Sequence, residues 1–420
     1  MKKLIMSITM SIKILLFCLC LLTYNFYNDS SIDDTSINNI KPQNMLSIML
    51  ESSAGSGNYE ISTLNSWPTD GYVFNSELSK CENGGTLSWD KTNKRVEFSG
   101  NNIDKCYVYF DVDTSMSLAE YVVSQYTGTQ GVNGIYYHDA NLTNGAGDNS
   151  YRYAGANPNN YVCFGSDDAT CPTENLYRII GLIDGKVKLI HADGATTDML
   201  GIGGGYVNTY QALLGGISSY YKGNGDLTKI GSYKWDKIGD NTWSTSITNT
   251  INLNTNYLTY LDSKNTKWKT MIDDTTWYVG GMNYNNGLAT NAKTAYDYEV
   301  GVNKDANTTV TSKIGLMYVS EYYYAASKDY WILPGYNSSG NNYKKSTNDN
   351  WLYTGLAEWT ISRNSDGSGD AFAVARDGTV RGVAVGRSNG SAVRPSFSLS
   401  SSIKFTLGEG TAVNPIRIKL

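Results

Sequence analysis

The sequence predicts a β-rich α+β fold from three observations. Two Asp-Gly pairs, Asp184-Gly185 and Asp377-Gly378, each lie between runs that favour strands, and such pairs are typical of tight β-hairpins. The chain has 33 Tyr and 42 Gly but a charged fraction of only 17%, a composition typical of β-rich extracellular proteins. Apolar residues recur at helical spacing in residues 117–126 and, less regularly, in residues 247–261, so a few helices are expected beside the strands.

The first 27 residues are predicted to be a targeting segment outside the fold. Lys2 and Lys3 precede an uncharged apolar run at residues 14–22, which is shorter than the ~20 residues that a membrane-spanning helix needs. No Ala-x-Ala cleavage pattern follows, so a cleaved signal peptide and an uncleaved membrane anchor both remain open. A lipid anchor at Cys18 or Cys20 is a third alternative, although no small residues precede them. The segment predicts an extracellular or cell-surface protein that touches the membrane through these residues alone.

The four remaining cysteines support export. Cys81, Cys106, Cys163 and Cys171 are an even number after a secretory start, which is typical of disulfides. Their order in the sequence suggests that Cys81 pairs with Cys106 and that Cys163 pairs with Cys171. The first bridge would close about 25 residues of chain and contribute roughly 3 kcal/mol in the loop-entropy model. A zinc site is not favoured, because no Cys-x-x-Cys pair occurs and the chain has only two histidines.

Composition divides the chain into five segments. They are the targeting segment 1–27, the linker 28–57, a small β domain 58–112, a helical connector with a loop 113–147, and a large domain 148–420. The linker is rich in Asp, Ser and Asn and is expected to hold at most a short helical turn at residues 45–50. The small β domain is predicted to be a β-sandwich-like spacer. A unit of this size buries little apolar surface, so its disulfide is expected to matter to its stability.

The last part of the large domain is predicted to be a meander of three short strands. They are expected at residues 372–374, 380–385 and 393–399, after the tryptophans Trp351 and Trp359. Val380 lies on one parity of the second strand, and Val383 and Val385 lie on the other, which predicts a β-bulge at Gly382. Pro395 has no backbone N–H to donate, so the third strand is expected at a sheet edge.

Two sets of motifs in the large domain resemble known proteins. Residues 355–360, GLAEWT, followed by ARDGTVRG and Val393-Arg394-Pro395, resemble the closing motif of the formylglycine-generating-enzyme-like branch of the C-type-lectin-like fold. More closely, the chain resembles bacterial envelope proteins that share YRIIGL, KVKLI, IGLMYVSEYYYA, Trp and AVRP. These motifs stand here at residues 177–182, 186–190, 314–325, 331 and 392–395. The resemblance covers residues 148–420 and implies a C-type-lectin-like domain, with long loops tied to a small sheet.

The residues do not predict an enzyme, and an enzyme of the same fold branch is left as the third alternative. The enzyme that names the fold branch uses late cysteines, and no cysteine follows Cys171 here. His138 and His191 are expected to be structural, because no nucleophile elbow or paired motif accompanies them. No catalytic residue and no cofactor is therefore predicted.

No metal or nucleic acid is predicted either. The calcium signature of C-type lectins is not matched, because Asn157-Pro158-Asn159 lacks the preceding acid. A sequence pI near 5.2 argues against nucleic acid, which needs a dense basic patch.

A binding surface is the remaining prediction for the large domain. Aromatic and amide-rich loops stack on ligands and adapt their hydrogen bonds, and arginines supply donors. The candidate ligand-binding residues are Trp351, Tyr353, Trp359, Arg376, Arg381, Arg387 and Asn389. A core role for Trp359 and a structural role for the arginines remain open. The sequence thus predicts an exported cell-envelope binding protein that recognises a glycan or a surface protein. A structural, self-assembling envelope or appendage subunit is the alternative.

Overall fold

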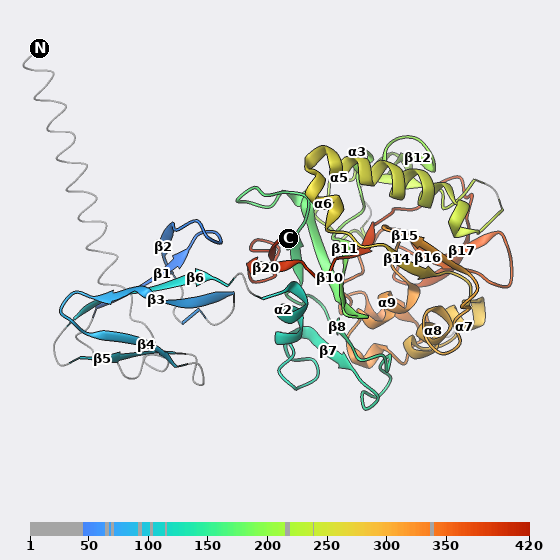
Figure 1. Cartoon of the computed structure of the whole chain (residues 1–420). Coiled ribbons are helices and arrows are strands. Elements are labelled where there is room, and N and C mark those ends of the chain that lie inside the picture. Colours follow the sequence, from blue (N-terminus) through green and yellow to red (C-terminus); the bar gives the residue numbers. More distant parts are fainter. Residues whose placement is uncertain are drawn as a thin grey trace, which may run out of the picture. The chain divides into compact units, whose positions relative to one another are not determined.

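The computed structural model describes residues 45–63, 67–68, 71–90, 95–100, 104–113, 116–214, 219–237, 239–336 and 340–420 (Figure 1). The chain divides into two compact units, Met1–Asp113 and Thr114–Leu420. Strands predominate over helices in the described residues, so the fold is β-rich α+β. The predicted targeting segment lies outside the described residues. Among the helices that are described, none is both long and apolar enough to cross a bilayer.

The first unit contains a four-stranded sheet and a separate hairpin. The sheet has the order β2-β1-β6-β3, in which β1 and β6 run parallel and the other pairs are antiparallel. The hairpin pairs β4 with β5. The strand bounds are β1 Met45–Glu51, β2 Tyr59–Ile61, β3 Tyr72–Cys81, β4 Thr86–Asp90, β5 Arg95–Ser99 and β6 Lys105–Val112.

A small core joins the hairpin to the sheet. Alternate residues of β6 are buried, as expected for a strand with one face on a core, and Val108 and Phe110 lie at its centre. Ile48 of β1 and Val96 of β5 belong to the same buried cluster, together with Trp67. The hairpin and the sheet therefore pack face to face.

The position of β1 corrects the predicted linker. Residues 45–50 were expected to be a helical turn within the linker 28–57, but they form the strand Met45–Glu51 in the middle of the sheet. Leu46, Ile48 and Leu50 have the spacing of a strand, and each pairs with a residue of β6 far along the chain. This pairing with β6 decides the structure, because a short, mostly apolar run such as residues 45–50 fits either a helix or a strand locally.

The disulfide Cys81–Cys106 is confirmed, and it links directly paired residues of β3 and β6. Replacing both cysteines with serine is expected to reduce the free energy of unfolding of the first unit by roughly 3 kcal/mol, because the bridge shortens the unfolded chain by a loop of 25 residues. Urea titration followed by proteolysis within residues 45–113 measures this loss. The matching double serine variant at Cys163 and Cys171, whose disulfide is also confirmed, should leave that transition unchanged. An unaltered first unit in the Cys81/Cys106 variant would contradict the prediction.

The second unit is built on a six-stranded sheet. The strands follow the order β19-β11-β10-β8-β7, and β9 also pairs with β10. Neighbouring strands in this sheet are antiparallel. The bounds are β7 Ile135–His138, β8 Ser150–Tyr153, β9 Tyr161–Cys163, β10 Leu176–Ile183, β11 Lys186–His191 and β19 Ser396–Ser398.

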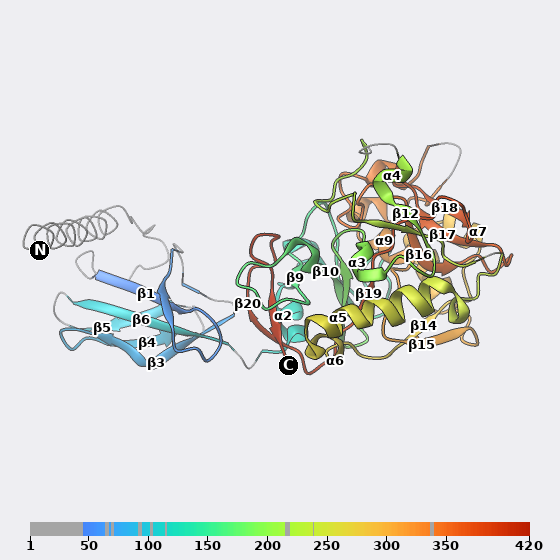
Figure 2. The same ribbon diagram turned by 90° about the horizontal axis from the view of Figure 1, so that it is seen from above.

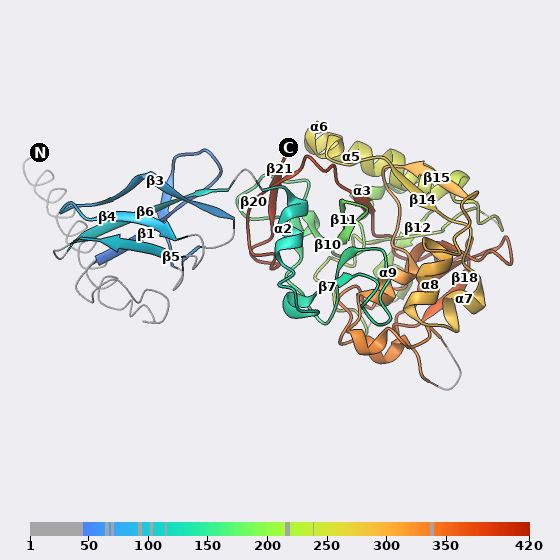
Figure 3. The ribbon, with the colours of Figure 1, turned by 60° about the horizontal axis from the view of Figure 1, so that its bottom comes forward.

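Smaller sheets and short helices surround this sheet. The smaller sheets pair β12 Tyr206–Thr209 with β13 Gly231–Tyr233, β14 Thr275–Tyr278 with β15 Thr309–Ser312, and β20 Lys404–Leu407 with β21 Arg417–Lys419; β16 Glu358–Arg363, β17 Asp370–Val374 and β18 Val380–Ala384 form a three-stranded sheet. The α-helices are α2 Leu118–Ser124, α3 Thr197–Leu200, α4 Tyr210–Leu214, α5 Leu258–Lys264, α6 Thr266–Thr270, α7 Tyr284–Leu288, α8 Ala292–Glu299 and α9 Val319–Tyr324. Figure 2 shows α5 along one side of this unit, and Figure 3 shows α7, α8 and α9 gathered together.

Both predicted Asp-Gly hairpins are present. Asp184 and Gly185 join β10 to β11 with φ values of 50° and 73°, as a type I′ turn requires. Gly378, with φ 82°, lies in the turn between β17 and β18. These turns fix the register of the two hairpins that carry the charged residues considered below.

The structure corrects two details of the predicted meander. Gly382 pairs with Phe372 in an uninterrupted β17–β18 ladder, so the predicted bulge is not there; the register shifts instead in β16, between Trp359 and Arg363. The bulge was predicted on the assumption that Val380, Val383 and Val385 are all buried on one face of the strand. The predicted third strand leaves the meander as β19 and pairs with β11. It lies at the edge of the large sheet, as Pro395 predicted.

Two helical predictions are also revised. The segment 113–147 was expected to be a connector, but the compact unit begins at Thr114 and takes in both α2 and the sheet strand β7. The helical stripe expected in residues 247–261 is displaced, because residues Thr248–Tyr257 form a π-helix before α5. The π-helix buries Leu253 and Tyr257 and leaves Ile251 exposed, and Leu261 is buried in α5.

Candidate ligand-binding site

The tryptophans among the predicted ligand-binding residues lie in the core of the second unit. Trp359 is fully buried, and its Nε1 donates to the backbone oxygen of Tyr233 at 2.7 Å. Trp351 is 5% exposed, and its Nε1 donates to the backbone oxygen of Tyr153 at 2.8 Å. Both side chains are enclosed and hydrogen-bonded internally, and only a small part of Trp351 lines a hollow, of about 210 Å³, that Tyr353 also lines.

Tyr353 connects the core to the predicted arginines. Its side chain is buried, and its hydroxyl donates to the backbone oxygen of Arg376. Lys222 lies over its ring, with the Nζ atom 5.3 Å from the ring centroid. Tyr353 therefore holds the backbone of the turn that carries Arg376 against the core.

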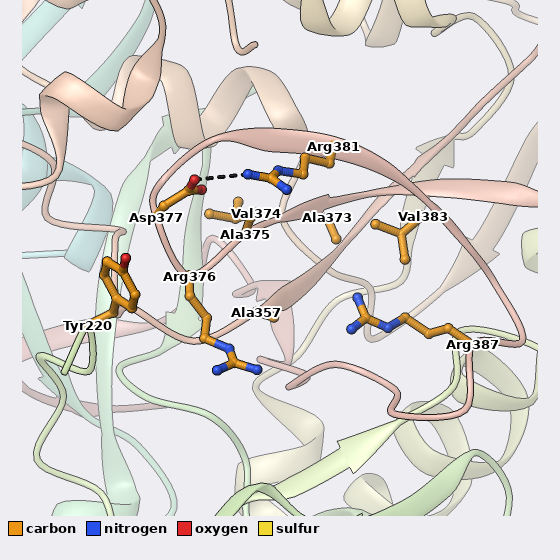
Figure 4. Close-up of a pocket in the computed structure, with 10 residues that line it drawn as sticks. All are labelled: Tyr220, Ala357, Ala373, Val374, Ala375, Arg376, Asp377, Arg381, Val383 and Arg387. Carbon is orange, nitrogen blue, oxygen red and sulfur yellow. Dashed lines mark hydrogen bonds and ion pairs between the residues drawn. The ribbon is translucent and has the colours of Figure 1, made fainter. Parts of the chain in front are cut away.

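The predicted arginines Arg376, Arg381 and Arg387 meet at one hollow of about 320 Å³ (Figure 4). We call it the arginine hollow. Its lining residues are Tyr220, Ala357, Ala373, Val374, Ala375, Arg376, Asp377, Arg381, Val383 and Arg387. A narrow extension shares Ala357, Arg376 and Arg387 and adds Tyr210 and Asn389. Four of the seven predicted residues thus line the hollow or its extension, and all four come from one hairpin and the loop that follows it.

The β17–β18 turn sets the position of Arg376. The Ala375 N–H donates to the Thr379 backbone oxygen at 2.7 Å, which closes the turn. Asp377 braces it, because its Oδ1 accepts from the Thr379 hydroxyl at 2.6 Å. Asp377 also pairs with Arg381, whose Nη2 lies 2.9 Å from Oδ2. Burial raises the pKa of Asp377, but the Thr379 hydrogen bonds and Arg381 outweigh it and hold the pKa below its ordinary value. Arg381 therefore already has a carboxylate partner.

Arg376 and Arg387 have no such partner. Neither forms an ion pair with any residue that the structure describes. They extend from opposite sides toward the middle of the arginine hollow (Figure 4). Burial lowers the pKa of the Arg387 guanidinium and Arg376 lowers it further, while Tyr210 opposes the shift. Two like charges facing one hollow repel each other, so an anion bound between them would remove an unfavourable interaction.

The rest of the lining is small, apolar and aromatic. Ala357 and Ala373 line the hollow beside the arginines, and neither bears a polar side chain. Tyr220 lies at the edge of the hollow with 47% of its surface exposed. The sequence prediction missed Tyr220, because no motif surrounds it. Asp377 could have been found, since it belongs to the Asp-Gly turn that placed Arg376.

A buried ion pair joins the two motifs that suggested the fold branch. Glu358 of the GLAEWT segment accepts from Arg394 Nε at 2.6 Å, and both side chains are almost fully buried. Arg394 Nη2 also donates to the Leu352 backbone oxygen at 2.8 Å. Burial raises the pKa of Glu358, and Arg394 opposes this effect. The pair fixes the start of β16 against the segment before β19.

The two histidines are buried side chains with internal contacts. His138 Nδ1 accepts from the Ala146 N–H at 3.0 Å, and burial, aided by Arg152, lowers the pKa of this imidazole well below its ordinary value. His191 lies between the backbone oxygens of Asp193 and Glu174. Neither lines the arginine hollow.

Metal-ligating side chains come together at one place in the described residues. Cys81, Asp104 and Cys106 lie close enough to share an ion. Their two sulfur atoms are bonded to each other in the disulfide, so neither is a thiolate ligand. Asp104 instead accepts from the Asn83 and Gly85 backbone N–H groups.

Comparison with known proteins adds no relative. No protein-family model matches the chain, and no curated protein or solved structure matches it significantly.

Proposed function

We propose that the second unit is a C-type-lectin-like domain of an exported cell-envelope protein, and that it binds an acidic glycan in the arginine hollow. The observation that carries the binding proposal is the pair of guanidinium groups, Arg376 and Arg387, that face one hollow without a carboxylate partner among the described residues. A carboxylate, sulfate or phosphate group on the ligand would accept from both. Export is supported by the two disulfides, which form in oxidising compartments.

A glycan fits the hollow better than a protein surface does. A volume of about 320 Å³ is at the lower end of small-molecule sites, whereas protein partners need a broad and flatter surface. The alanine lining leaves room for the apolar face of a sugar ring, and the aromatic side chain of Tyr220 lies at the edge of the hollow. The C-type-lectin-like assignment rests on the motif resemblance. The Glu358–Arg394 ion pair supports it, because it joins the two parts of that motif, GLAEWT and Val393-Arg394-Pro395.

Replacing Arg387 with alanine is expected to weaken binding of a uronic-acid oligosaccharide by about tenfold or more, because a hydrogen bond to a charged group contributes about 1.5–3 kcal/mol. Arg376→Ala should have a similar effect, and both losses should shrink as salt is added. Isothermal titration of the whole protein measures these affinities. Arg381→Ala is the matched control, since Asp377 already pairs with that arginine, and its effect should be clearly smaller.

The ligand offers a second control. The same oligosaccharide with its carboxyl groups reduced to alcohols keeps its shape and loses its charge. If the reduced sugar bound as tightly as the acid, or if Arg381→Ala weakened binding as much as Arg387→Ala, the proposed role of the two unpaired arginines would be wrong.

A further inference from the structure

A second hollow of about 500 Å³ lies on the large sheet and contains charged side chains that the arginine hollow does not use. Arg152 of β8 and Lys188 of β11 both pair with Gly181 of β10, so they flank the same position of the sheet on adjacent strands. Side chains at paired positions of an antiparallel sheet point to one face. Both residues are almost completely buried, and both line this second hollow.

Each of these two cations already has one acidic partner. Lys188 Nζ lies 2.6 Å from Glu321 Oε1 of α9, and Arg152 Nη2 lies 2.6 Å from Asp148 Oδ2. Aromatic rings enclose Lys188, whose Nζ is 4.7 Å from the ring centroid of Trp277 and 4.9 Å from that of Tyr318. The floor of the second hollow is therefore polar, charged and held in place by internal contacts.

The floor retains hydrogen-bond donors that the described residues do not use. Arg152 donates through Nε to Ser150 and through Nη2 to Asp148, but Nη1 has no partner among them. The Lys188 ammonium group has three N–H donors and makes one hydrogen bond, to Glu321. The buried Thr275 hydroxyl on β14 also lacks a partner in the described structure. These three groups line one hollow, and together they would suit a carboxylate.

Charge balance argues against a simple anion. Four acids (Asp148, Asp184, Asp274 and Glu321) and four bases (Arg152, Lys186, Lys188 and Lys304) line the second hollow. A ligand that brought only a negative charge would leave that charge uncompensated beside a buried floor, which is unfavourable. A ligand with one negative and one positive group would keep the balance.

Asp184 supplies a place for the positive group. It is exposed in the β10–β11 turn, lines the second hollow, and forms no ion pair with a described residue. Asp184 directly follows β10 and lies three positions beyond Gly181, which is roughly 10 Å at the rise of a strand. Because its side chain and those of the floor each cover part of that distance, the two charges of the ligand must be several ångströms apart.

We propose that the second hollow binds an extended zwitterion, such as an ω-amino acid or a dipeptide with free termini. Its carboxylate lies at the floor against Arg152, Lys188 and Thr275, and its ammonium group lies at the mouth against Asp184. The aromatic walls pack against the chain between the two charges. This site is separate from the arginine hollow and does not depend on the function proposed there.

Three probes test the proposal on the whole protein by isothermal titration and thermal shift. ε-Aminohexanoate has widely separated charges, glycine has the same charges close together, and an equimolar mixture of acetate and methylammonium has them unlinked. We expect ε-aminohexanoate to bind more tightly than glycine and the mixture to have little effect. Equal effects of the mixture and of ε-aminohexanoate, or no binding of any probe at millimolar concentration, would overturn the proposal.

Two variants that should fold normally locate the site. Thr275→Val removes a buried hydroxyl that has no described partner, so it should leave stability unchanged or raise it while weakening ε-aminohexanoate about fivefold. Asp184→Asn keeps a favoured Asn-Gly type I′ turn and should weaken ε-aminohexanoate about threefold. Arg387→Ala should not change this affinity. Binding that survives both Thr275→Val and Asp184→Asn unchanged would place the probe elsewhere and contradict the proposal.

Discussion

Replacing Arg394 with leucine is expected to lower the melting temperature of the second unit by about 10 °C. The substitution removes one partner of a buried ion pair, and breaking such a pair costs about 3–5 kcal/mol because the other charge stays buried. One kcal/mol corresponds to about 2–4 °C in a domain of 150–250 residues, and somewhat less in a larger unit. Calorimetry of the purified variant measures the change.

A double variant separates the lost pair from lost packing. Glu358→Leu combined with Arg394→Leu removes both charges, and replacing a buried ion pair by apolar residues is often nearly neutral. The double variant should therefore be more stable than Arg394→Leu alone. If the two variants were equally unstable, the loss would come from packing around the arginine and not from the unpaired Glu358.

The stability of the single variant Arg394→Leu is also expected to depend on pH, with a sign that follows from the pKa of Glu358. Burial raises the pKa of Glu358 in the folded protein, and Arg394 opposes this shift. Without the arginine, the folded-state pKa should rise further above that of the unfolded chain. A group with a raised folded-state pKa stabilises the fold at low pH and loses this effect as the pH rises. Arg394→Leu should therefore be less destabilised near pH 4 than at pH 7 relative to the unsubstituted protein.

Replacing Gly355 with alanine is expected to damage both stability and binding. Gly355 has φ 75°, and an added Cβ would overlap the backbone oxygen of Tyr220 and lie 2.9 Å from Tyr221 Cα. Backbone atoms cannot move aside as a flexible side chain can. We expect a loss of at least about 2 kcal/mol, since the left-handed conformation alone costs about 1–2 kcal/mol for residues other than glycine. The displacement of Tyr220 should also weaken the acidic oligosaccharide at the arginine hollow.

Gly369→Ala is the matched control for this change. No atom outside its chain neighbours lies within 4 Å of an added Cβ at Gly369, so stability and binding should both stay close to those of the unsubstituted protein. Denaturant titration and oligosaccharide titration of the two variants test this. A Gly355→Ala protein with normal stability would show that the segment containing Tyr220 can shift without cost.

Features of this chain that depend only on residues close together in the sequence could be predicted from the sequence. The Asp184-Gly185 turn was found because a type I′ turn needs φ above zero at two positions, and the disulfides followed from sequence order. Features that depend on distant partners were missed. Residues 45–50 became a strand only through pairing with β6, and β19 left the meander to pair with β11.

The same contrast between local and distant partners explains why only part of the candidate site could be predicted. Arg376 lies in a turn that the sequence marks clearly, and Arg381 and Arg387 follow it, so the three could be grouped in advance. Trp351 and Trp359 were predicted to stack on a ligand but are buried. The sequence alone does not tell a buried tryptophan from an exposed one. The second hollow was missed because Arg152, Lys188 and Thr275 come from three strands that only the folded sheets bring together.

The position of β19 late in the sequence also determines when the large sheet of the second unit can be completed during synthesis. This strand and the β20–β21 hairpin come late in the chain, yet they hold early segments: Leu118 N–H donates to the Ile403 backbone oxygen, and Cys163 N–H donates to that of Ile416. A ribosome adding about 5–20 residues per second takes roughly 15–60 s to make the chain from residue 114 to the last of these strands. Within that interval, from the completion of β11 at His191 to the completion of β19 at Ser398, β11 has an unpaired edge, and its backbone groups are open to wrong partners in the nascent chain.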